Sequence, residues 1–472
     1  MASTIKVNNI QNQCGANIAN KCGTTITLGA SGDTITLACG ASQTGFGRTG
    51  TVDWDTTAKT ASFTAVSGNG YFVNTSGGAI TVTLPASPSA GDIVAVKDYS
   101  NTADTNNITI ARNGSNIDGT TINATIANEG GSVTLVYVDG TKGWLITDAA
   151  QKSDLVFPSY IVATGGTVTC CGDYKIHTFT GPGTFTVTCA GNPAGSTTVD
   201  YLVVAGAGGG TDQRGAGGGA GGFRLSNSTC MPAPLTSPLA NPTGITASVT
   251  SYPITVGAGG AGFGSFPSPL AFGNPGSNSV FSTITSTGGG GAANDAPPGV
   301  GGSGGSGGGG VAVGGGPSEP GGAGNTPPVS PPQGNPGGSG AQAPFHGAGG
   351  GGGASAAGGN GATNGTGGPG GTGSYVLGTG FAGSNGTPGP VCGAKYFAGG
   401  GGGSFYCTGT AGTGGTGGGG TSGTGPGPAP NAAGQSGTTN TGGGGGGGWH
   451  PSLGQAGGSG GSGIVIIRYK YQ

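Results

Sequence analysis

The chain of 472 residues has a formal net charge of −2, and only 6% of its residues are charged, compared with about 25% in typical globular domains. Such weak charge excludes the basic surface that holds a nucleic-acid backbone. It is also unlike a solvated disordered chain, which relies on charge. Glycine (119 residues) and proline (30 residues) are abundant, but the first 200 residues have the composition of ordinary β structure.

The N-terminus and the cysteines indicate the compartment in which the protein is made, and they indicate no particular chemistry. The opening MASTIKVNNIQ lacks the apolar core of a secretion signal, and no apolar run approaches the ~18 residues of a membrane span. We therefore expect assembly in a cytoplasm, no membrane insertion, and mostly reduced, buried cysteines. No C-x-x-C pair occurs, so no metal site is predicted. The cysteines that could oxidise later are Cys170 or Cys171 with Cys189, and Cys392 with Cys407.

Residues 1–50 contain a short repeat. Thr25–Leu28 (TITL) recurs nine residues later as Thr34–Leu37, and this alternation predicts strands with one buried face. Strands this short form no core alone. Two alternatives remain for this N-terminal attachment segment: an intertwined β shaft of three chains, or a plain hairpin.

Residues 51–150 are predicted to form one β-sandwich or jelly-roll-like domain. Short alternating runs are separated by turn signals such as Asn113-Gly114 and Asp139-Gly140, as in such folds. The expected strands are 61–65, 70–74, 79–84, 92–98, 107–112, 133–138 and 144–147.

A β linker region is expected over residues 151–198, with strands at 174–179 and 183–189. The glycine-rich domain then occupies residues 199–472. Its apolar runs near 201–205, 254–256 and 280–285 pass directly into glycine, and the run 464–469 is entered from glycine. This polarity predicts a framing sheet whose strand lines continue as glycine segments.

From about Gly288 to Gly463 only Asp295, Glu319 and Lys395 are charged, and glycine fills most positions. Two states suit this composition. One is a flexible linker. The other is a bundle of polyglycine II helices, left-handed with three residues per turn, whose backbone groups point sideways to neighbouring helices.

The energetics favour a crowded bundle over an isolated helix. Ordering a residue costs about 1–2 kcal/mol, whereas a net hydrogen bond contributes about 0.5–1.5 kcal/mol. Only a helix bonded on several sides is stable. Turn-formers such as Pro297-Pro298 and Pro331-Pro332 separate the runs. Collagen is excluded, because a three-residue glycine period holds only locally. We predict a packed lattice over about 288–463.

No motif indicates catalysis. Matches to G-x-G-x-x-G are expected by chance in such a glycine-rich chain, and none opens a helix after a strand. P-loop and H-E-x-x-H patterns are missing from the sequence, and G-x-S-x-G occurs only inside glycine runs such as Gly301–Gly305, so we expect no enzyme, no cofactor and no metal. His346 and His450 have no carboxylates near them in sequence, and His177 has only Asp173, four positions before it. A pair of carboxylates from residues 50–155 is the alternative, as in glycoside hydrolysis.

Aromatic residues gather where the glycine runs break. They suit a recognition surface, because Tyr and Trp give large contact area at low entropy cost. The alternative is that some rings pack over helix ends or at a contact between copies. The receptor-binding candidates are Phe345, His346, Tyr375, Phe381, Tyr396, Phe397, Phe405, Tyr406, Trp449 and His450.

Several stretches resemble a known kind of protein. VDYLVVAGAGGG, YPITVGAGG, SVFSTITSTGGGG and the closing GGSGIVIIRYKY resemble the glycine-rich domain of bacteriophage tail-fibre and adhesin proteins. TITLGASGDTITL, the stretch 70–102 and LVYVDGTKGWLIT are similar to fibre proteins of marine and cyanobacterial phages.

This resemblance implies a virion structural protein, a homotrimer whose N-terminal part contacts other tail proteins. Its glycine-rich tip would bind a host protein or glycan through loops between polyglycine II helices. It assigns no individual receptor residue. The sequence leaves two other hypotheses: a purely architectural fibre of head, neck or baseplate, and a polysaccharide-cleaving tail spike.

Overall fold

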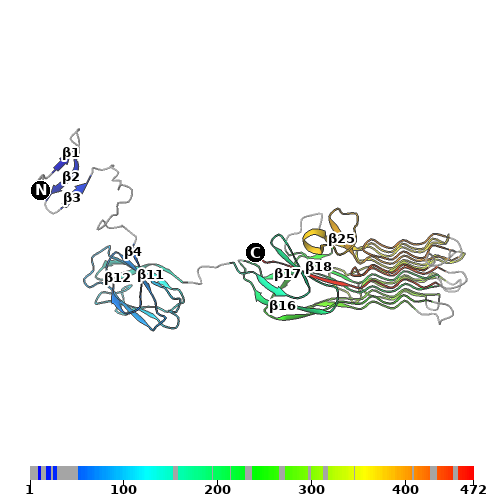
Figure 1. Cartoon of the computed structure of the whole chain (residues 1–472), viewed down its shortest axis with the longest axis horizontal. Helices are drawn as coiled ribbons and strands as arrows, with labels where there is room; N and C mark the ends of the chain where they lie inside the picture. The colour runs from blue at the N-terminus through cyan, green and yellow to red at the C-terminus, as the bar shows by residue number, and fades with distance from the viewer. Residues whose placement is uncertain are drawn as a thin grey trace. The chain divides into compact units, whose positions relative to one another are not determined.

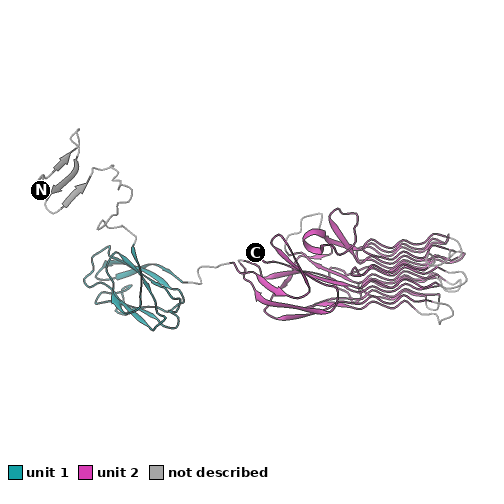
Figure 2. Cartoon of the chain, viewed as in Figure 1, with its two compact units in different colours: residues 1–156 teal, residues 157–472 magenta. Residues whose placement is uncertain are grey.

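The computed structural model describes residues 9–11, 17–22, 25–28, 52–151, 158–193, 195–212, 214–228, 236–264, 272–295, 299–311, 317–344, 346–406, 409–425, 433–449 and 455–472. These residues are almost entirely in strands or extended segments, as predicted. Contacts divide the chain into two compact units, Met1–Val156 and Phe157–Gln472 (Figure 2). No helix among the described residues has the length and apolarity to cross a bilayer.

The N-terminal residues form a small antiparallel sheet in the order β1-β2-β3. Its strands are β1 (Asn9–Gln11), β2 (Asn17–Cys22) and β3 (Thr25–Leu28). The first TITL repeat is thus a strand. The second, Thr34–Leu37, lies outside the described residues, and the three-chain shaft stays a prediction.

Residues 53–150 form two sheets around one apolar core, as expected of a sandwich. The core includes Val73, Val82, Ile110, Leu135 and Trp144, none more than marginally exposed. The five-stranded sheet has the order β12 (Gly143–Ala150), β11 (Ser132–Asp139), β8 (Ile93–Asp98), β6 (Asn69–Val73), β4 (Asp53–Lys59). The four-stranded sheet has the order β10 (Ala124–Ile126), β9 (Ile108–Ala111), β7 (Ile80–Thr83), β5 (Phe63–Thr64).

The strands wind differently from a jelly roll, which is antiparallel. From β4 to β9 successive strands alternate between the two sheets. Strands of the same sheet therefore run parallel, as in the pairs β4–β6, β6–β8, β5–β7 and β7–β9. The alternating apolar pattern is the same for either winding, so the sequence did not distinguish them.

The second unit contains a five-stranded and a seven-stranded sheet, and their strands lie at one end of this unit (Figure 1). The five-stranded sheet has the order β13 (Ile161–Thr164), β16 (Gly183–Ala190), β21 (Ser251–Thr255), β22 (Ser279–Phe281), β23 (Ile284–Ser286). The seven-stranded sheet has the order β14 (Thr167–Cys171), β15 (Tyr174–Phe179), β26 (Ile464–Lys470), β17 (Thr198–Val204), β18 (Phe223–Ser226), β19 (Ala240–Asn241), and β20 (Ile245–Thr246) also pairs with β17.

The C-terminal strand β26 lies inside this unit with both faces buried. Val465, Ile467 and Tyr469 pack between the two sheets. Ile464 and Ile466 pack on the opposite face. That face is covered by the hairpin of β24 (Ser374–Leu377) and β25 (Ala394–Phe397) with the short turn η2 (Gly378–Ala382). A central strand buried on both faces explains the unbroken apolar run at the C-terminus.

The expected linker region belongs to this unit and not between domains. Strands β13 to β16 join the two sheets, and β15 pairs directly with the C-terminal strand β26. We predicted residues 151–198 as a separate linker because β26, the strand that pairs with β15, lies almost 300 residues further along the chain. A boundary near Phe157 describes the structure better than one at 198.

The glycine segments form the predicted lattice of polyglycine II helices, and residues 215–222 show its geometry. Amides three residues apart donate to the same neighbouring segment, as three residues per turn require. The N–O pairs are Gly217–Gly349 (3.1 Å), Ala220–Gly352 (3.0 Å), Gly218–Gly445 (2.8 Å), Gly221–Gly442 (3.0 Å), Gly219–Gly290 (2.9 Å) and Gly222–Thr287 (2.8 Å). The carbonyls of Gly217, Gly218 and Gly219 accept from Gly309, Gly401 and Gly208. This helix is therefore bonded on all sides.

Close packing leaves no room for side chains at these positions. A Cβ on Gly218 would lie 2.1 Å from the carbonyl oxygen of Gly208, and one on Gly401 would lie 2.0 Å from that of Gly445. The lattice is wider than predicted, because the segments 206–212 and 215–222 belong to it. The junction after residue 205 had predicted a glycine segment there, but both segments are short and include alanines, so the expected bounds of 288–463 left them out.

Candidate functional site

The aromatic candidates divide between the two ends of the lattice. The chain runs outward from the sheets after β17 and returns to them at β18, and it also runs outward after β23 and after β25 (Figure 1). Arg214, Asp295 and Tyr406 follow these three strands by nine or ten residues and contact one another. His346, Phe405, Tyr406 and Trp449 therefore lie at the end far from the sheets. Tyr375, Phe381, Tyr396 and Phe397 lie on or beside the β24–β25 hairpin, at the sheet end.

Five candidates are interior residues, which corrects their assignment as exposed contacts. Phe381 and Phe397 are fully buried in the core beneath the β24–β25 hairpin. Tyr396, Phe405 and Trp449 are each less than 5% exposed. The packing alternative applies to these rings. Phe345 and His450 lie outside the described residues. Only His346, Tyr375 and Tyr406 are partly exposed.

At the far end, one arginine joins several turns of the lattice. Nη1 of Arg214 lies 3.3 Å from Oδ2 of Asp295, and its guanidinium stacks 4.3 Å from the centre of the Tyr406 ring. His346 meets the same ring edge-on, with centroids 6.2 Å apart. We call Arg214, Asp295, His346 and Tyr406 the distal cluster. Its contacts join residues almost 200 positions apart in the sequence. They therefore fix the turns that carry these residues relative to one another.

The backbone and charge of the distal cluster are unusual. Arg214 and His346 both adopt left-handed φ values, +64° and +42°, a conformation that costs about 1–3 kcal/mol outside glycine and concentrates at functional sites. Burial, and secondarily the Arg214 charge, lowers the pKa of His346. The imidazole is therefore neutral at pH 7, beside a permanently charged guanidinium.

Buried polar atoms lie near the distal cluster. Oδ1 of Asp212 and Nε1 of Trp449 have no hydrogen-bond partner among the described residues, although both side chains are buried. Burial also raises the pKa of Asp212. Trp449 packs against Phe405 at 6.1 Å, with Ala411 beside them. An unsatisfied buried polar atom costs about 1–3 kcal/mol, so this end of the lattice is locally destabilised.

The distal cluster combines side chains of different chemical character. Tyr406 offers part of an aromatic face, His346 and Arg214 offer nitrogen groups, and Asp295 offers a carboxylate. Such a set suits a peptide or a sugar, which combine apolar faces with hydrogen-bonding groups. No three metal-ligating side chains come together in the described part of the chain.

Sequence reasoning missed Arg214, Asp212 and the pairing of Asp295. A signal was present: they are charged residues that interrupt glycine runs in a chain with few charges. Aromatic content alone did not distinguish buried rings from exposed ones, so both were predicted as binding residues.

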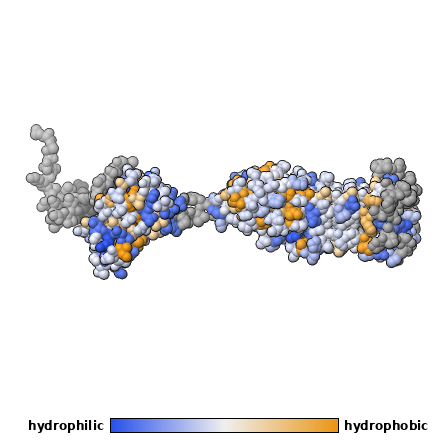
Figure 3. All heavy atoms as spheres, turned by 90° about the horizontal axis from the view of Figure 1, so that it is seen from below, coloured by the Kyte–Doolittle hydropathy of each residue, from blue (hydrophilic) through white to orange (hydrophobic). Residues whose placement is uncertain are grey.

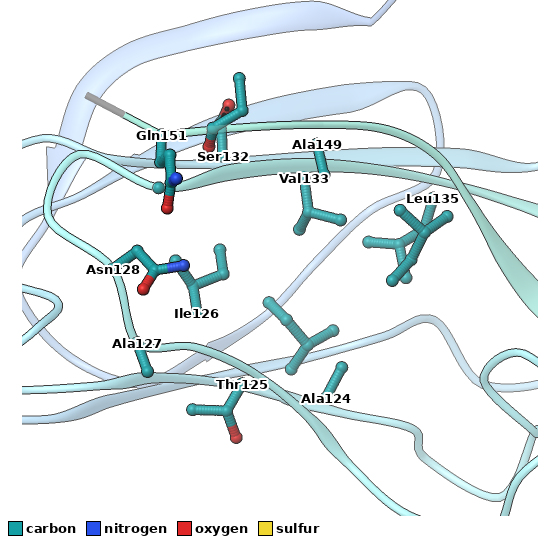
Figure 4. Close-up of a pocket in the computed structure, with 14 residues that line it drawn as sticks. Ala124, Thr125, Ile126, Ala127, Asn128, Ser132, Val133, Leu135, Ala149 and Gln151 are labelled. Atoms are coloured by element: carbon teal, nitrogen blue, oxygen red, sulfur yellow. Dashed lines mark hydrogen bonds between the residues drawn. The ribbon is translucent and has the colours of Figure 1, made fainter. Parts of the chain in front are cut away.

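A cleft lies in the first unit, between β10 and the β11–β12 pair (Figure 4). This cleft of about 330 Å³ is lined by aliphatic residues, including Ile126, Val133 and Leu135, with Asn128 and Gln151 among its polar lining residues. No Asp or Glu lines it, so it lacks the carboxylate pair that glycoside hydrolysis uses. Its lining is mainly apolar and uncharged.

The glycine-rich domain family matches residues 178–470. The chain belongs to this family. The matched range begins in β15 and ends with β26, so it includes the lattice and both sheets except their edge strands β13 and β14. No curated protein matches the chain.

Proposed function

We propose that the protein is a structural fibre of a bacteriophage virion and that its lattice end is a host-recognition adhesin. The main observation in support is that a lattice fixed by backbone hydrogen bonds ends in the distal cluster. Rigid presentation lowers the entropy cost of binding. Sequence resemblance to marine phage fibres supplies the virion context, the homotrimer and contacts of the N-terminal part with other tail proteins.

Membership of the glycine-rich domain family and the lattice geometry support a structural role, and the distal cluster supports recognition. In this proposal Tyr406 and His346 contact a surface protein or glycan of the host. Arg214 is a positioning residue, because it holds Tyr406 through its ring face and Asp295 through an ion pair.

Two tyrosines give a matched test. Tyr406 and Tyr375 are both partly exposed, but they lie at opposite ends of the lattice. Labelled full-length protein carrying Tyr406→Ala or Tyr375→Ala is incubated with a panel of marine bacteria, including cyanobacteria. We expect wild type and Tyr375→Ala to adsorb to a host in the panel, and Tyr406→Ala to lose roughly tenfold or more in affinity, the effect of a binding hot spot.

Equal adsorption of the two variants would contradict recognition by the distal cluster and favour the architectural hypothesis. Release of oligosaccharide from cells by the purified protein would favour the tail-spike hypothesis.

A further inference from the structure

One side of the second unit has a long uncharged strand edge. β13 pairs only with β16, and β14 pairs only with β15, so both are edge strands among the described residues. Gly165 and Gly166, with φ of +113° and +62°, turn the chain from one sheet to the other. The edges of both sheets are thus one continuous segment, IVATGGTVTCC at residues 161–171.

This edge segment is exposed to a degree unusual for a strand. Every residue of β14 is exposed, with Val168 at 46%, and in β13 Val162 is 48% exposed. Cys170 and Cys171 are free and exposed thiols. Among the described residues the outer edge of β14 therefore has no strand partner. Near its end, η2 lies beside Cys171, whose Sγ would be 3.6 Å from a Cβ on Gly380.

Other edges of the four- to seven-stranded sheets carry the protection that natural proteins use. β4 carries Asp53, Asp55 and Lys59, and β12 carries Asp148. β5, β10, β19 and β23 have no more than three residues. Charge and brevity both discourage pairing with another chain. Among the described edges of these sheets, only β13 and β14 are longer and have neither charge nor proline.

The two neighbouring cations do not block a partner strand, and the exposed Asp173 lies two residues beyond the edge segment. Lys175 stacks over the Tyr471 ring at 4.9 Å, and the buried Arg468 lies over the Tyr174 ring at 3.9 Å. Both cations are held by rings of their own chain. A second copy of this neutral segment would bring Val and Thr side chains together and place no like charges opposite one another, which suits cross-strand pairing.

We propose that residues 161–171 are the contact through which this chain pairs with a second copy of itself, by adding the partner's edge strand to β14. Backbone hydrogen bonds supply the contact, as in other cases of strand addition. Because the contact is at the sheet end, the distal clusters stay free, and an assembly presents several of them. Linked sites raise apparent affinity without any new contact to the ligand.

The first test is the assembly state of the full-length protein by sedimentation over a range of concentrations. We expect species larger than the monomer. Val168→Lys places a charge on the edge in each copy and should weaken assembly roughly tenfold. The matched control is Val249→Lys, which changes a more exposed valine (66%) away from this edge. It should leave assembly unchanged.

The second test uses the native thiols and needs no substitution. On dilution from assembly to monomer, alkylation of Cys170 and Cys171 should accelerate several-fold. Cys392, which is exposed on another loop, should react at one rate throughout and serves as the internal control. A monomer at every concentration, assembly that resists Val168→Lys, or thiol rates independent of concentration would each overturn the proposal.

Discussion

The sandwich of residues 53–150 and the glycine lattice hold their backbones in place by opposite means. In the sandwich, side chains such as Leu135 and Trp144 fill the space between two sheets. In the lattice, neighbouring backbones pack directly against one another, and the space that a side chain on Gly218 would need is occupied by the backbone of Gly208. Apolar burial contributes about 25 cal/mol per Å², whereas each lattice bond contributes about 0.5–1.5 kcal/mol.

The surfaces differ accordingly (Figure 3). The first unit shows strongly hydrophilic and strongly hydrophobic residues side by side, while much of the lattice flank is pale, because glycine is near neutral in hydropathy. Substitutions should therefore act differently in the two regions: side-chain loss harms the sandwich, and side-chain gain harms the lattice.

The largest effect is expected from adding a side chain to the lattice. Gly218→Val would place atoms within 2.1 Å of the Gly208 carbonyl and should lower the unfolding free energy of the second unit by about 4 kcal/mol or more. Thermal and denaturant unfolding measure this. Gly181→Ala is the control, because a Cβ there meets nothing within 4 Å. Equal stability of the two variants would refute a close-packed lattice.

Removing a side chain from the sandwich is expected to rank next. Leu135→Ala deletes a fully buried residue and should cost about 3 kcal/mol in the first unit. The unfolding transition of the second unit should not move. Ile122→Ala, at a position 71% exposed, should change stability by less than about 0.5 kcal/mol. A shift of both transitions by Leu135→Ala would show that the units do not unfold separately.

A smaller, pH-dependent effect is expected at His177 in the sheets of the second unit. Its ring is buried, 2.7 Å from the Gly165 carbonyl and 3.1 Å from the Tyr469 hydroxyl, and burial lowers its pKa. The unfolded chain binds a proton below about pH 6.5, where the folded chain stays neutral. Stability therefore falls as pH drops below that value. His177→Gln should flatten the profile between pH 6.5 and 5, and an unchanged slope would contradict this origin.

The smallest stability effect is expected at the distal cluster. Arg214→Ala removes an ion pair and a ring contact, together worth about 1 kcal/mol. Backbone strain at residue 214 remains in the variant. The second unit should thus lose about 1 kcal/mol or less in denaturant unfolding, while host adsorption falls as for Tyr406→Ala. A large loss of stability would make Arg214 a core residue of the lattice.

Patterns that depend on local sequence predicted the structure well. The strand 174–179 was expected at its observed bounds, because its residues alternate and its ends are marked by Gly172-Asp173 and Gly181. The junctions Val204 to Gly206 and Gly463 to Ile464 were also visible, since apolar residues give way abruptly to glycine.

Features set by distant partners were not predictable. β13 and β14 were missed because they are short and exposed, and only their pairing with β16 and β15 makes them strands. Glycine runs are interchangeable by composition, so nothing in the sequence indicates that residues 217–222 lie beside 287–290 and 442–445. Whether an aromatic ring is buried also depends on which segments pack around it. The sequence alone therefore did not show that Phe397 is buried while Tyr406 is partly exposed.

Amide hydrogen exchange across residues 206–222 tests the central claim most directly. Each amide of Gly217 to Gly222 donates to a neighbouring segment, so these amides should exchange only through opening of the lattice, as slowly as those of β26. Exchange at the rate of an unstructured chain in the native protein would contradict the lattice and the rigid recognition end that depends on it.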